Sequence, residues 1–193
     1  GYFIMTEKEK CLLGQLYAAN NDKSLISERL HCKEMCRDYN DLRPTETEAR
    51  ENLIRTLLGK TDGAFLIEQP FYCDYGYNIE IGKNFYSNFN LVILDEAKVS
   101  FGDNVFIGPN CAFYTAGHPL DVTSRNKGLE YAKPITVGNN VWFGGNVVVL
   151  PGVTIGDNCV IGAGSIVNKD IPSNTMAAGN PCRVIKSLEN YNI

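Results

Sequence analysis

The sequence predicts a mainly β fold: a parallel β-helix with an N-terminal helical cap and one long protruding loop. Three observations indicate it. Residues 137–172 repeat every six residues, residues 1–60 carry helical spacing with capping signals, and residues 114–136 interrupt the repeat. A fixed six-residue period is typical of a solenoid, because strands alternate with period 2 and amphipathic helices with period 3.6.

Two positions of each hexad in this stretch are apolar or small. The first is apolar and is often followed by glycine, which we interpret as the residue where the backbone turns. The fifth is small or β-branched. The first positions are Val137, Phe143, Val149, Ile155, Ile161 and Val167, and the fifth are Val141, Val147, Val153, Cys159, Ser165 and Ile171. We expect both sets to point inward, with three hexads to each triangular coil.

The same phase recurs upstream, so we expect the solenoid to begin near residue 70. The interruption contains Gly117-His118-Pro119 and Lys133-Pro134, which is typical loop chemistry. A long loop that leaves a regular stack is more often functional than accidental. We therefore expect a helical cap at residues 1–60 and a β-helix domain at residues 61–193, the latter including loop 114–136 and a C-terminal tail.

Capping signals predict three helices in the cap. Thr6 and Glu9 form a capping-box pattern that opens a helix expected to run through Tyr17. A second helix is expected at residues 25–40, and Thr45 is expected to open a third that ends at Gly59. A solenoid needs a cap, because its first coil exposes an apolar cross-section and an unpaired strand edge. The second possible role of these helices is to contribute residues to a substrate pocket.

Composition limits the classes of function. The net charge is −4 and the sequence has no dense Lys/Arg cluster, which argues against a nucleic-acid partner. No apolar run approaches the roughly 18 residues of a membrane span, and no signal-peptide pattern is visible, so we expect no membrane association and a cytoplasmic protein. The residues before Met5 resemble a cloning remnant and are left out of the fold prediction.

The 7 cysteines are dispersed and odd in number, which favours reduced thiols in a reducing compartment. Cys111 and Cys159 fall on fifth hexad positions and are expected to be small core residues. His31 and Cys32 with Cys36 form only a weak metal-binding pattern, because no second pair accompanies them. We therefore expect no metal site.

The sequence has 2 histidines, of which His118 is the candidate catalytic residue. His31 falls on a predicted helix, where a histidine is usually solvated or packed. His118 lies between Gly117 and Pro119 on a loop that projects from a rigid scaffold. Imidazole titrates near neutral pH, so His118 is suited to accept a proton from a hydroxyl and return it later.

Six segments carry a more specific pattern: residues 84–90, 94–95, 115–119, 134–142, 151–156 and 178–185. Together they resemble the galactoside/maltose O-acetyltransferase branch of the hexapeptide-repeat acyltransferases. The hexads alone would indicate only the superfamily, whereas the Gly-His-Pro loop and the Asn88-Phe89-Asn90 segment narrow it to this branch. The resemblance extends over essentially the whole chain from Met5.

This resemblance implies a left-handed parallel β-helix, a rare exception to the right-handed crossover rule. It also implies a homotrimer with active sites between neighbouring subunits, acetyl-CoA as the co-substrate and a sugar hydroxyl as the acceptor. His118 would deprotonate that hydroxyl for direct attack on the thioester and then pass the proton to the departing CoA thiolate. No acyl-enzyme is needed.

The resemblance also assigns residues to the acceptor site. Asn88 would hydrogen-bond the sugar or orient the reacting groups, and Asp74, Tyr86 and Asp95 match positions that line the same pocket. For Asp95 the alternative is a carboxylate that holds a corner turn, and the neighbouring Glu96 makes the assignment ambiguous. Tyr86 has packing as its alternative.

On the donor side the resemblance implies a larger set of CoA contacts: Trp142, Gly145, Ala163, Asn168, Lys169, Arg183 and Lys186. The cationic side chains would meet phosphates, and main-chain groups at the turns would pair with the pantetheine amides. Related proteins often have Ser at position 145 and Thr at position 168. Gly145 can offer only its backbone N–H to an oxyanion.

Three other functions are alternatives to a sugar O-acetyltransferase, and a feature of the sequence argues against each. A γ-type carbonic anhydrase needs three histidine ligands for its metal, which the 2 histidines of this chain do not readily supply. A xenobiotic O-acetyltransferase shares the fold, the donor and the histidine base, but the helical front end favours the sugar-modifying branch. A non-catalytic solenoid scaffold has no need of His118 in its Gly-x-Pro frame.

Overall fold

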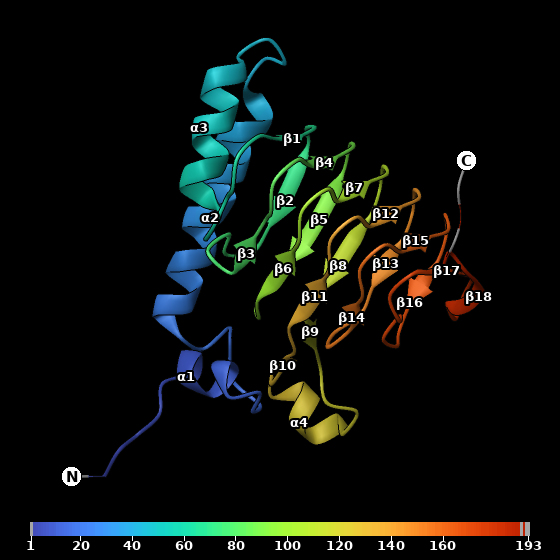
Figure 1. The fold of residues 1–193 in the computed structure, drawn as a ribbon. Helices are drawn as coiled ribbons and strands as arrows, with labels where there is room; N and C mark the ends of the chain where they lie inside the picture. The colour runs from blue at the N-terminus through green and yellow to red at the C-terminus, as the bar shows by residue number, and fades with distance from the viewer. Residues whose placement is uncertain (1, 190, 192–193) are drawn as a thin grey trace.

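Short strands stack in three sheets around one core in the computed structural model, which describes residues 2–189 and 191 (Figure 1). The largest sheet contains β1 (Phe65–Ile67), β4 (Phe85–Ser87), β7 (Phe106–Ile107), β12 (Trp142–Phe143), β15 (Val160–Ile161), β17 (Thr175–Ala178) and β18 (Arg183–Ser187), in that order. All neighbours pair in parallel except β18, which is antiparallel to β17. The solenoid thus begins at Phe65, slightly earlier than expected.

The other two sheets form the remaining sides of the coil and are also parallel. One contains β3 (Ile79–Glu80), β6 (Val99–Phe101), β11 (Ile135–Val137) and β14 (Thr154–Ile155). The other contains β2 (Phe71–Cys73), β5 (Leu91–Leu94), β8 (Ala112–Tyr114), β13 (Val148–Val149) and β16 (Ile166–Val167). The parallel β-solenoid with an N-terminal helical region confirms the predicted fold class.

The core follows the hexad pattern. The first and fifth positions of the hexads in residues 137–172 are all buried, including Cys159 and Ser165, and Cys111 is buried as expected. The register stacks equivalent positions, so Phe143 lies between Ile107 and Ile161 on neighbouring coils. Phe85, Phe101, Phe113 and Phe143 also form a column of edge-on ring contacts with centroids 5.0–5.3 Å apart. Such edge-to-face pairs stabilise beyond their buried area.

The role assigned to the hexad glycines was wrong. Gly138 has no positive φ; instead a Cβ there would overlap Asp157 Oδ1 of the next coil. That carboxylate oxygen accepts the N–H of Asn139 at 2.7 Å, so glycine is needed for close coil stacking. The turns are made by residues with positive φ two positions later: asparagines such as Asn140 (φ 58°) and Asn158 (φ 58°), and the glycines Gly152 (φ 82°) and Gly164 (φ 77°). Asparagine tolerates the left-handed region better than other residues with a Cβ.

These corner asparagines also bond to one another along the solenoid axis. The Nδ2 of Asn140 donates to the Oδ1 of Asn158 at 2.9 Å, and Asn104 donates to Asn140 at 3.2 Å. The ladder extends to Asn84 at one end and to Asn174 at the other. One residue type thus supplies both the turn and a bond between coils.

Helices cover the first coil. Helix α2 (Lys23–Asp41) matches its prediction, and with α3 (Thr47–Leu57) it lies against the β1–β3 end of the solenoid (Figure 1). Helix α3 begins later than expected: Glu46 is its N-cap residue, and the Glu46 carboxylate accepts the N–H of Arg43 at 2.6 Å. Thr45 therefore lies in the preceding turn. No helix in the described part of the chain is long and apolar enough to cross a membrane.

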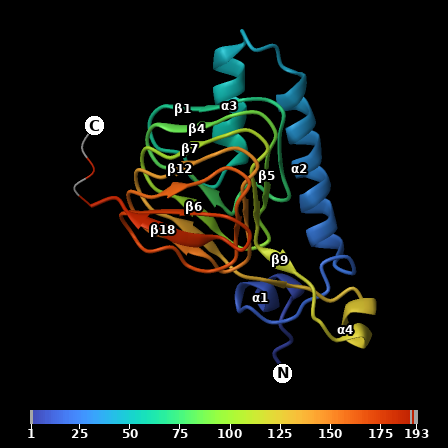
Figure 2. The same ribbon diagram turned by 90° about the vertical axis from the view of Figure 1, so that its right-hand side faces the viewer.

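Helix α1 (Glu7–Leu12) has the predicted capping box between Thr6 and Glu9 but ends earlier than expected. Gly14 adopts φ 72° and turns the chain, which frees Tyr17 to form an extended bridge with Glu130. Figure 2 shows α1 close to β9 and α4, the elements of the protruding loop. The loop is more ordered than expected: β9 (Ala116–Gly117) pairs antiparallel with β10 (Tyr131–Ala132), and α4 (Val122–Asn126) lies between them.

Candidate active site in the protruding loop

His118 directly follows β9 and is exposed. Gly117 precedes it because a Cβ at that position would overlap the Tyr131 hydroxyl on the paired strand. The Nδ1 of His118 lies 3.0 Å from the carbonyl oxygen of Leu129. A carbonyl oxygen only accepts, so Nδ1 carries the proton and Nε2 of the neutral ring is left as an acceptor.

A cavity of about 240 Å³ opens beside this imidazole. Its wall combines three carboxylic acids with residues from the helical cap: Asn20, Arg29, Lys33, Asp74, Glu96, His118 and Glu130. The cap therefore does more than cover the first coil. Arg29 is held in place by Tyr75, whose hydroxyl lies 2.7 Å from Nη1, and by the Ala19 carbonyl at 3.1 Å from Nη2.

Asp74 lines this cavity, whereas Asp95 does not. Asp95 is 0% exposed, and its carboxylate accepts the N–H groups of Asp74, Tyr75 and Gly76 at 2.8–3.0 Å. Burial raises the pKa of Asp95 to about 6, and the three backbone donors oppose that rise. The interpretation of Asp95 as an acceptor contact is corrected: it holds the turn that positions Asp74.

Glu96, and not the neighbouring Asp95, lines the cavity beside His118. Burial raises the pKa of Glu96 to about 10, with a hydrogen bond to Asp74 and nearby negative charge adding to the rise. Glu96 is therefore protonated at neutral pH and carries a proton that it can donate. Burial also raises the pKa of Glu130, while the positive charge of the Arg29 guanidinium opposes that effect.

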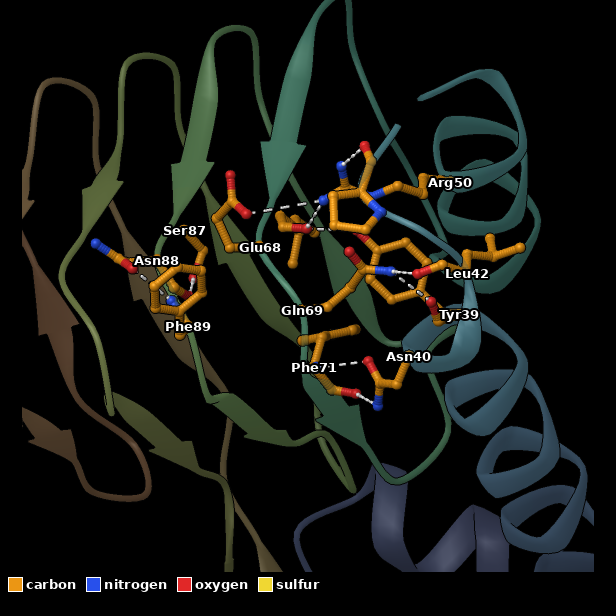
Figure 3. Close-up of polar contacts among 12 residues, drawn as sticks. Tyr39, Asn40, Leu42, Arg50, Glu68, Gln69, Phe71, Ser87, Asn88 and Phe89 are labelled. Carbon is orange, nitrogen blue, oxygen red and sulfur yellow. Dashed lines mark hydrogen bonds and ion pairs between the residues drawn. The ribbon is translucent and has the colours of Figure 1, made fainter. Parts of the chain in front are cut away.

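Asn88 and Tyr86 lie apart from His118 within one chain. Tyr86 belongs to β4, and Asn88 follows the same strand. Asn88 Oδ1 accepts the N–H of Phe89 at 2.7 Å, which closes the corner and leaves the Nδ2 end pointing outward (Figure 3). Neither residue lines the cavity beside His118.

The predicted donor residues fall into three places. Trp142 and Lys186 line an apolar groove of about 620 Å³ over the largest sheet, where Trp142 is 56% exposed and thus forms a wall of the groove. Gly145 and Ala163 occupy matching corners of adjacent coils, where Gly164 N donates to Gly145 O at 2.9 Å.

The third place contains Asn168, Lys169 and Arg183, all exposed. Arg183 Nη1 lies 3.4 Å from Asn168 Oδ1 and 2.7 Å from the carbonyl oxygen of Cys182. The Cys182 carbonyl and Asn168 thus both orient the guanidinium.

Sequence reasoning missed several residues of the cavity beside His118: Asn20, Arg29, Lys33, Glu96 and Glu130. Of these residues, only Glu96 could have been suspected from the sequence, because it is adjacent to Asp95. Arg29 and Lys33 look like ordinary charges on an exposed helix face, and Glu130 lies in a segment without periodicity.

Family models match both parts of the chain. A maltose acetyltransferase hexapeptide capping motif matches residues 10–63, and the six-repeat bacterial transferase hexapeptide matches residues 134–169. The galactoside O-acetyltransferase of Escherichia coli K12 is 48% identical over 184 residues, 95% of this chain and 90% of that protein. The chain belongs to the galactoside/maltose O-acetyltransferase family. This confirms the resemblance drawn from the Gly-His-Pro loop and the hexads.

Solved structures of this family agree with the fold. A maltose O-acetyltransferase from Clostridium difficile 630 superposes with a TM-score of 0.94 at 52% identity, covering 95% of this chain and 98% of that one. A galactoside acetyltransferase in complex with coenzyme A gives a TM-score of 0.94 at 47% identity, covering 97% and 94%. The protein is therefore an acetyltransferase of this type.

Proposed function

We propose that this acetyltransferase moves the acetyl group of acetyl-CoA to a hydroxyl of a sugar, with His118 as the general base. The observation that carries the proposal is the contact between His118 Nδ1 and the carbonyl oxygen of Leu129 at 3.0 Å. That contact fixes the tautomer in which Nε2 accepts a proton. Two relatives with solved structures are complexed with coenzyme A or acetyl-CoA.

The reaction is a direct transfer. His118 accepts the hydroxyl proton at Nε2 while the hydroxyl oxygen bonds to the thioester carbonyl carbon. The C–S bond then breaks, and His118 returns the proton to the departing thiolate sulfur. Electrons and protons balance without an acyl-enzyme, so no nucleophilic side chain is required.

The cavity beside His118 suits a polyhydroxylated acceptor. Sugar recognition needs fixed polar groups, and the wall supplies an ionic donor in Arg29 and carboxyl acceptors in Asp74 and in Glu96, whose proton is engaged with Asp74. Arg29 comes from the cap, which is the element that matches the maltose acetyltransferase model. This favours a sugar over the antibiotic alcohol of a xenobiotic acetyltransferase.

The groove along the largest sheet suits the donor. Trp142 offers an exposed apolar face, and Lys186 adds a cation beside it. We assign the pantetheine arm to this groove, and we assign the phosphates to Lys186 with Lys169 and Arg183. Gly145 contributes its backbone N–H only.

The active unit in this proposal is a homotrimer with sites between subunits. In one chain Asn88 and Tyr86 lie away from His118, and the apolar groove with Trp142 and Phe106 is open to solvent. A second subunit packed beside this groove would form its other wall, leave it open to the donor, and bring Asn88 toward a neighbour's His118. We place the protein in the cytoplasm, where the cysteines, all free in the described structure, would stay reduced.

A thiol-release assay with acetyl-CoA tests the activity. Candidate sugars (galactosides, maltose and glucose) and antibiotic alcohols are supplied as acceptors at equal concentration. We expect release of CoA to depend on a sugar. Release only with an antibiotic alcohol would replace the sugar assignment, and no CoA binding at millimolar donor would leave the scaffold interpretation in place of the enzyme.

A further inference from the structure

Three buried cysteines meet beneath the cap, in a place that the acetyl-transfer site does not use. Cys32 and Cys36 lie one helical turn apart on the same face of α2, and Cys73 ends β2 opposite them. The sulfur of Cys73 lies 3.5 Å from that of Cys32 and 3.9 Å from that of Cys36. All three sulfurs lie within 4.8 Å of one another.

Neighbouring contacts hold these thiols in position. Asn40, one turn after Cys36, clasps Phe71 on β2: Nδ2 donates to the Phe71 carbonyl at 3.0 Å and Oδ1 accepts its N–H at 2.9 Å. Figure 3 shows this clasp beside the amide of Gln69, which donates to the Tyr39 and Leu42 carbonyls at 2.8 Å. Both contacts hold the C-terminal end of α2 against β2 and the residues before it, and α2 packs on β2, so the fold sets the spacing of the cysteines.

That spacing matches thiolates around a single metal ion. Metal–sulfur bonds of about 2.3 Å place sulfurs about 4.0 Å apart in a trigonal site and about 3.8 Å apart in a tetrahedral one. For a trigonal site the Cys32–Cys73 separation would widen by about 0.5 Å and the Cys36–Cys73 separation by about 0.1 Å. Among the described residues this group contains three cysteines and no histidine or carboxylate.

We propose that Cys32, Cys36 and Cys73 form a three-thiolate site for a soft, thiophilic metal ion, and that Cu(I) is the ion that fits it. Soft thiolate ligands select Cu(I) over hard ions. Structural zinc sites are almost always four-coordinate, and in the described part of the chain no fourth histidine, cysteine or carboxylate joins this cluster. The sulfur atoms bind as thiolates, and the thiol protons they lose pass to solvent.

The surroundings provide access and charge compensation. A cavity of about 310 Å³ reaches Cys36 and Cys73 from the surface, and its charged lining residues are Lys33, Arg37 and Asp41. Arg37 pairs with Asp41 at 3.7 Å, so Lys33 is the cation left to offset part of the net negative charge of a trigonal Cu(I) thiolate site.

A Cu(I) titration of the full chain, performed anaerobically against a chromophoric Cu(I) chelator, tests the proposal without using turnover. We expect the wild type to take one tightly held Cu(I) per chain. Cys36→Ala and Cys73→Ala should each weaken it by about 100-fold or more, as expected for losing one of the metal's few protein ligands. Cys159→Ala and Cys111→Ala remove buried thiols outside the cluster and should leave the affinity unchanged.

Equal Cu(I) affinity in the cluster variants and the wild type would overturn the site. X-ray absorption on the wild-type complex adds a measurement that does not depend on variant folding: three sulfur ligands support the assignment, and two overturn it. Tight Zn²⁺ binding that excludes Cu(I) would also overturn the three-coordinate assignment.

Discussion

Tyr17 and Glu130 exchange both of their backbone hydrogen bonds, at 2.9 Å and 3.0 Å. This bridge joins the segment after α1 to the loop that carries His118. Tyr17 is itself buried, in a small cluster with Cys11, Leu25 and Ala132. Because Leu129 precedes Glu130 and contacts the His118 ring, the position of the imidazole depends on the cap as well as on the loop.

The bridge can be tested with two substitutions at one position. Glu130→Pro removes the N–H that donates to Tyr17, whereas Glu130→Ala removes only the carboxylate. We expect kcat/KM for the acceptor to be at least about tenfold lower in the Pro variant than in the Ala variant, which corresponds to one lost hydrogen bond. The measurement is steady-state acetylation at saturating acetyl-CoA.

Donor binding serves as the control, since the groove near Trp142 lies away from the bridge. CoA affinity should be similar in both Glu130 variants. If the two variants turn over equally, the bridge does not position the imidazole.

His118→Ala should lower the acetylation rate by at least about 10²-fold, the lower end for loss of a general base. CoA affinity and oligomeric state should be nearly unchanged, because His118 is exposed and packs on no coil. His31→Ala is the matched control: it removes the other histidine, which is exposed on α2. Wild-type turnover in the His118 variant would refute the mechanism.

Much of the fold was predictable because the coil geometry of the solenoid imposes a repeating pattern on the sequence. Each inward position of a hexad, such as Phe143 and Val147, must be apolar or small in every coil, so the period survives in a single chain. The role of Gly138 was not predictable, because it depends on Asp157, 19 positions later and one coil away. The end of α1 was missed because the pairing of Tyr17 with Glu130 overrides the helical spacing of nearby leucines.

The site was predictable only where local chemistry marks it. His118 stands out because glycine and proline flank it. Glu130 and Arg29 come to the same cavity from a loop and a helix far apart in the chain, and no spacing rule connects them. The sequence assigned Asp95 to the cavity, but Glu96 lines it instead. The backbone N–H groups of residues 74–76 bind the Asp95 carboxylate, and this contact cannot be read from two adjacent acidic residues.

Asp95 and Asp74 should therefore respond differently to the same change. Asp95→Asn places an NH₂ group among backbone N–H donors and should cost about 1–3 kcal/mol of unfolding free energy, the penalty for an unsatisfied buried donor. Asp74→Asn should instead raise KM for the acceptor by about tenfold, the loss of one hydrogen bond from a charged group. Urea unfolding and acceptor kinetics on both variants separate the effects, and a purely kinetic phenotype for Asp95→Asn would contradict the positioning role.

The asparagine ladder predicts an unusual order of stability. Asn140→Gly removes the bonds to Asn104 and Asn158 but keeps a residue that tolerates φ 58°. Asn140→Ala removes the same bonds and adds about 1–2 kcal/mol for a Cβ in the left-handed region. We expect the temperature of thermal unfolding to be highest for the wild type, lower for Asn140→Gly and lowest for Asn140→Ala. If Ala is the more stable variant, the backbone conformation is not what selects asparagine at these corners.

Glu96 gives the protein a pH-dependent stability. Its pKa is about 10 in the folded chain against an ordinary value of 4.5, so between these values the folded state keeps a proton that the unfolded state has lost. The contribution of Glu96 is thus complete below about pH 4.5 and is lost as pH rises toward 10, with a slope of up to about 1.4 kcal/mol per pH unit.

Glu96→Gln replaces the protonated acid with a neutral group of similar shape that does not titrate. We expect its free energy of unfolding, measured by urea titration from pH 5 to pH 9, to fall less steeply than that of the wild type. The titration of Asp95, whose pKa is about 6, is present in both proteins and cancels in the difference. Glu48→Gln changes an exposed carboxyl on α3 and should follow the wild-type curve. Parallel curves for Glu96→Gln and the wild type would mean that Glu96 is ionised in the folded protein and does not hold a proton toward Asp74 in the acceptor cavity.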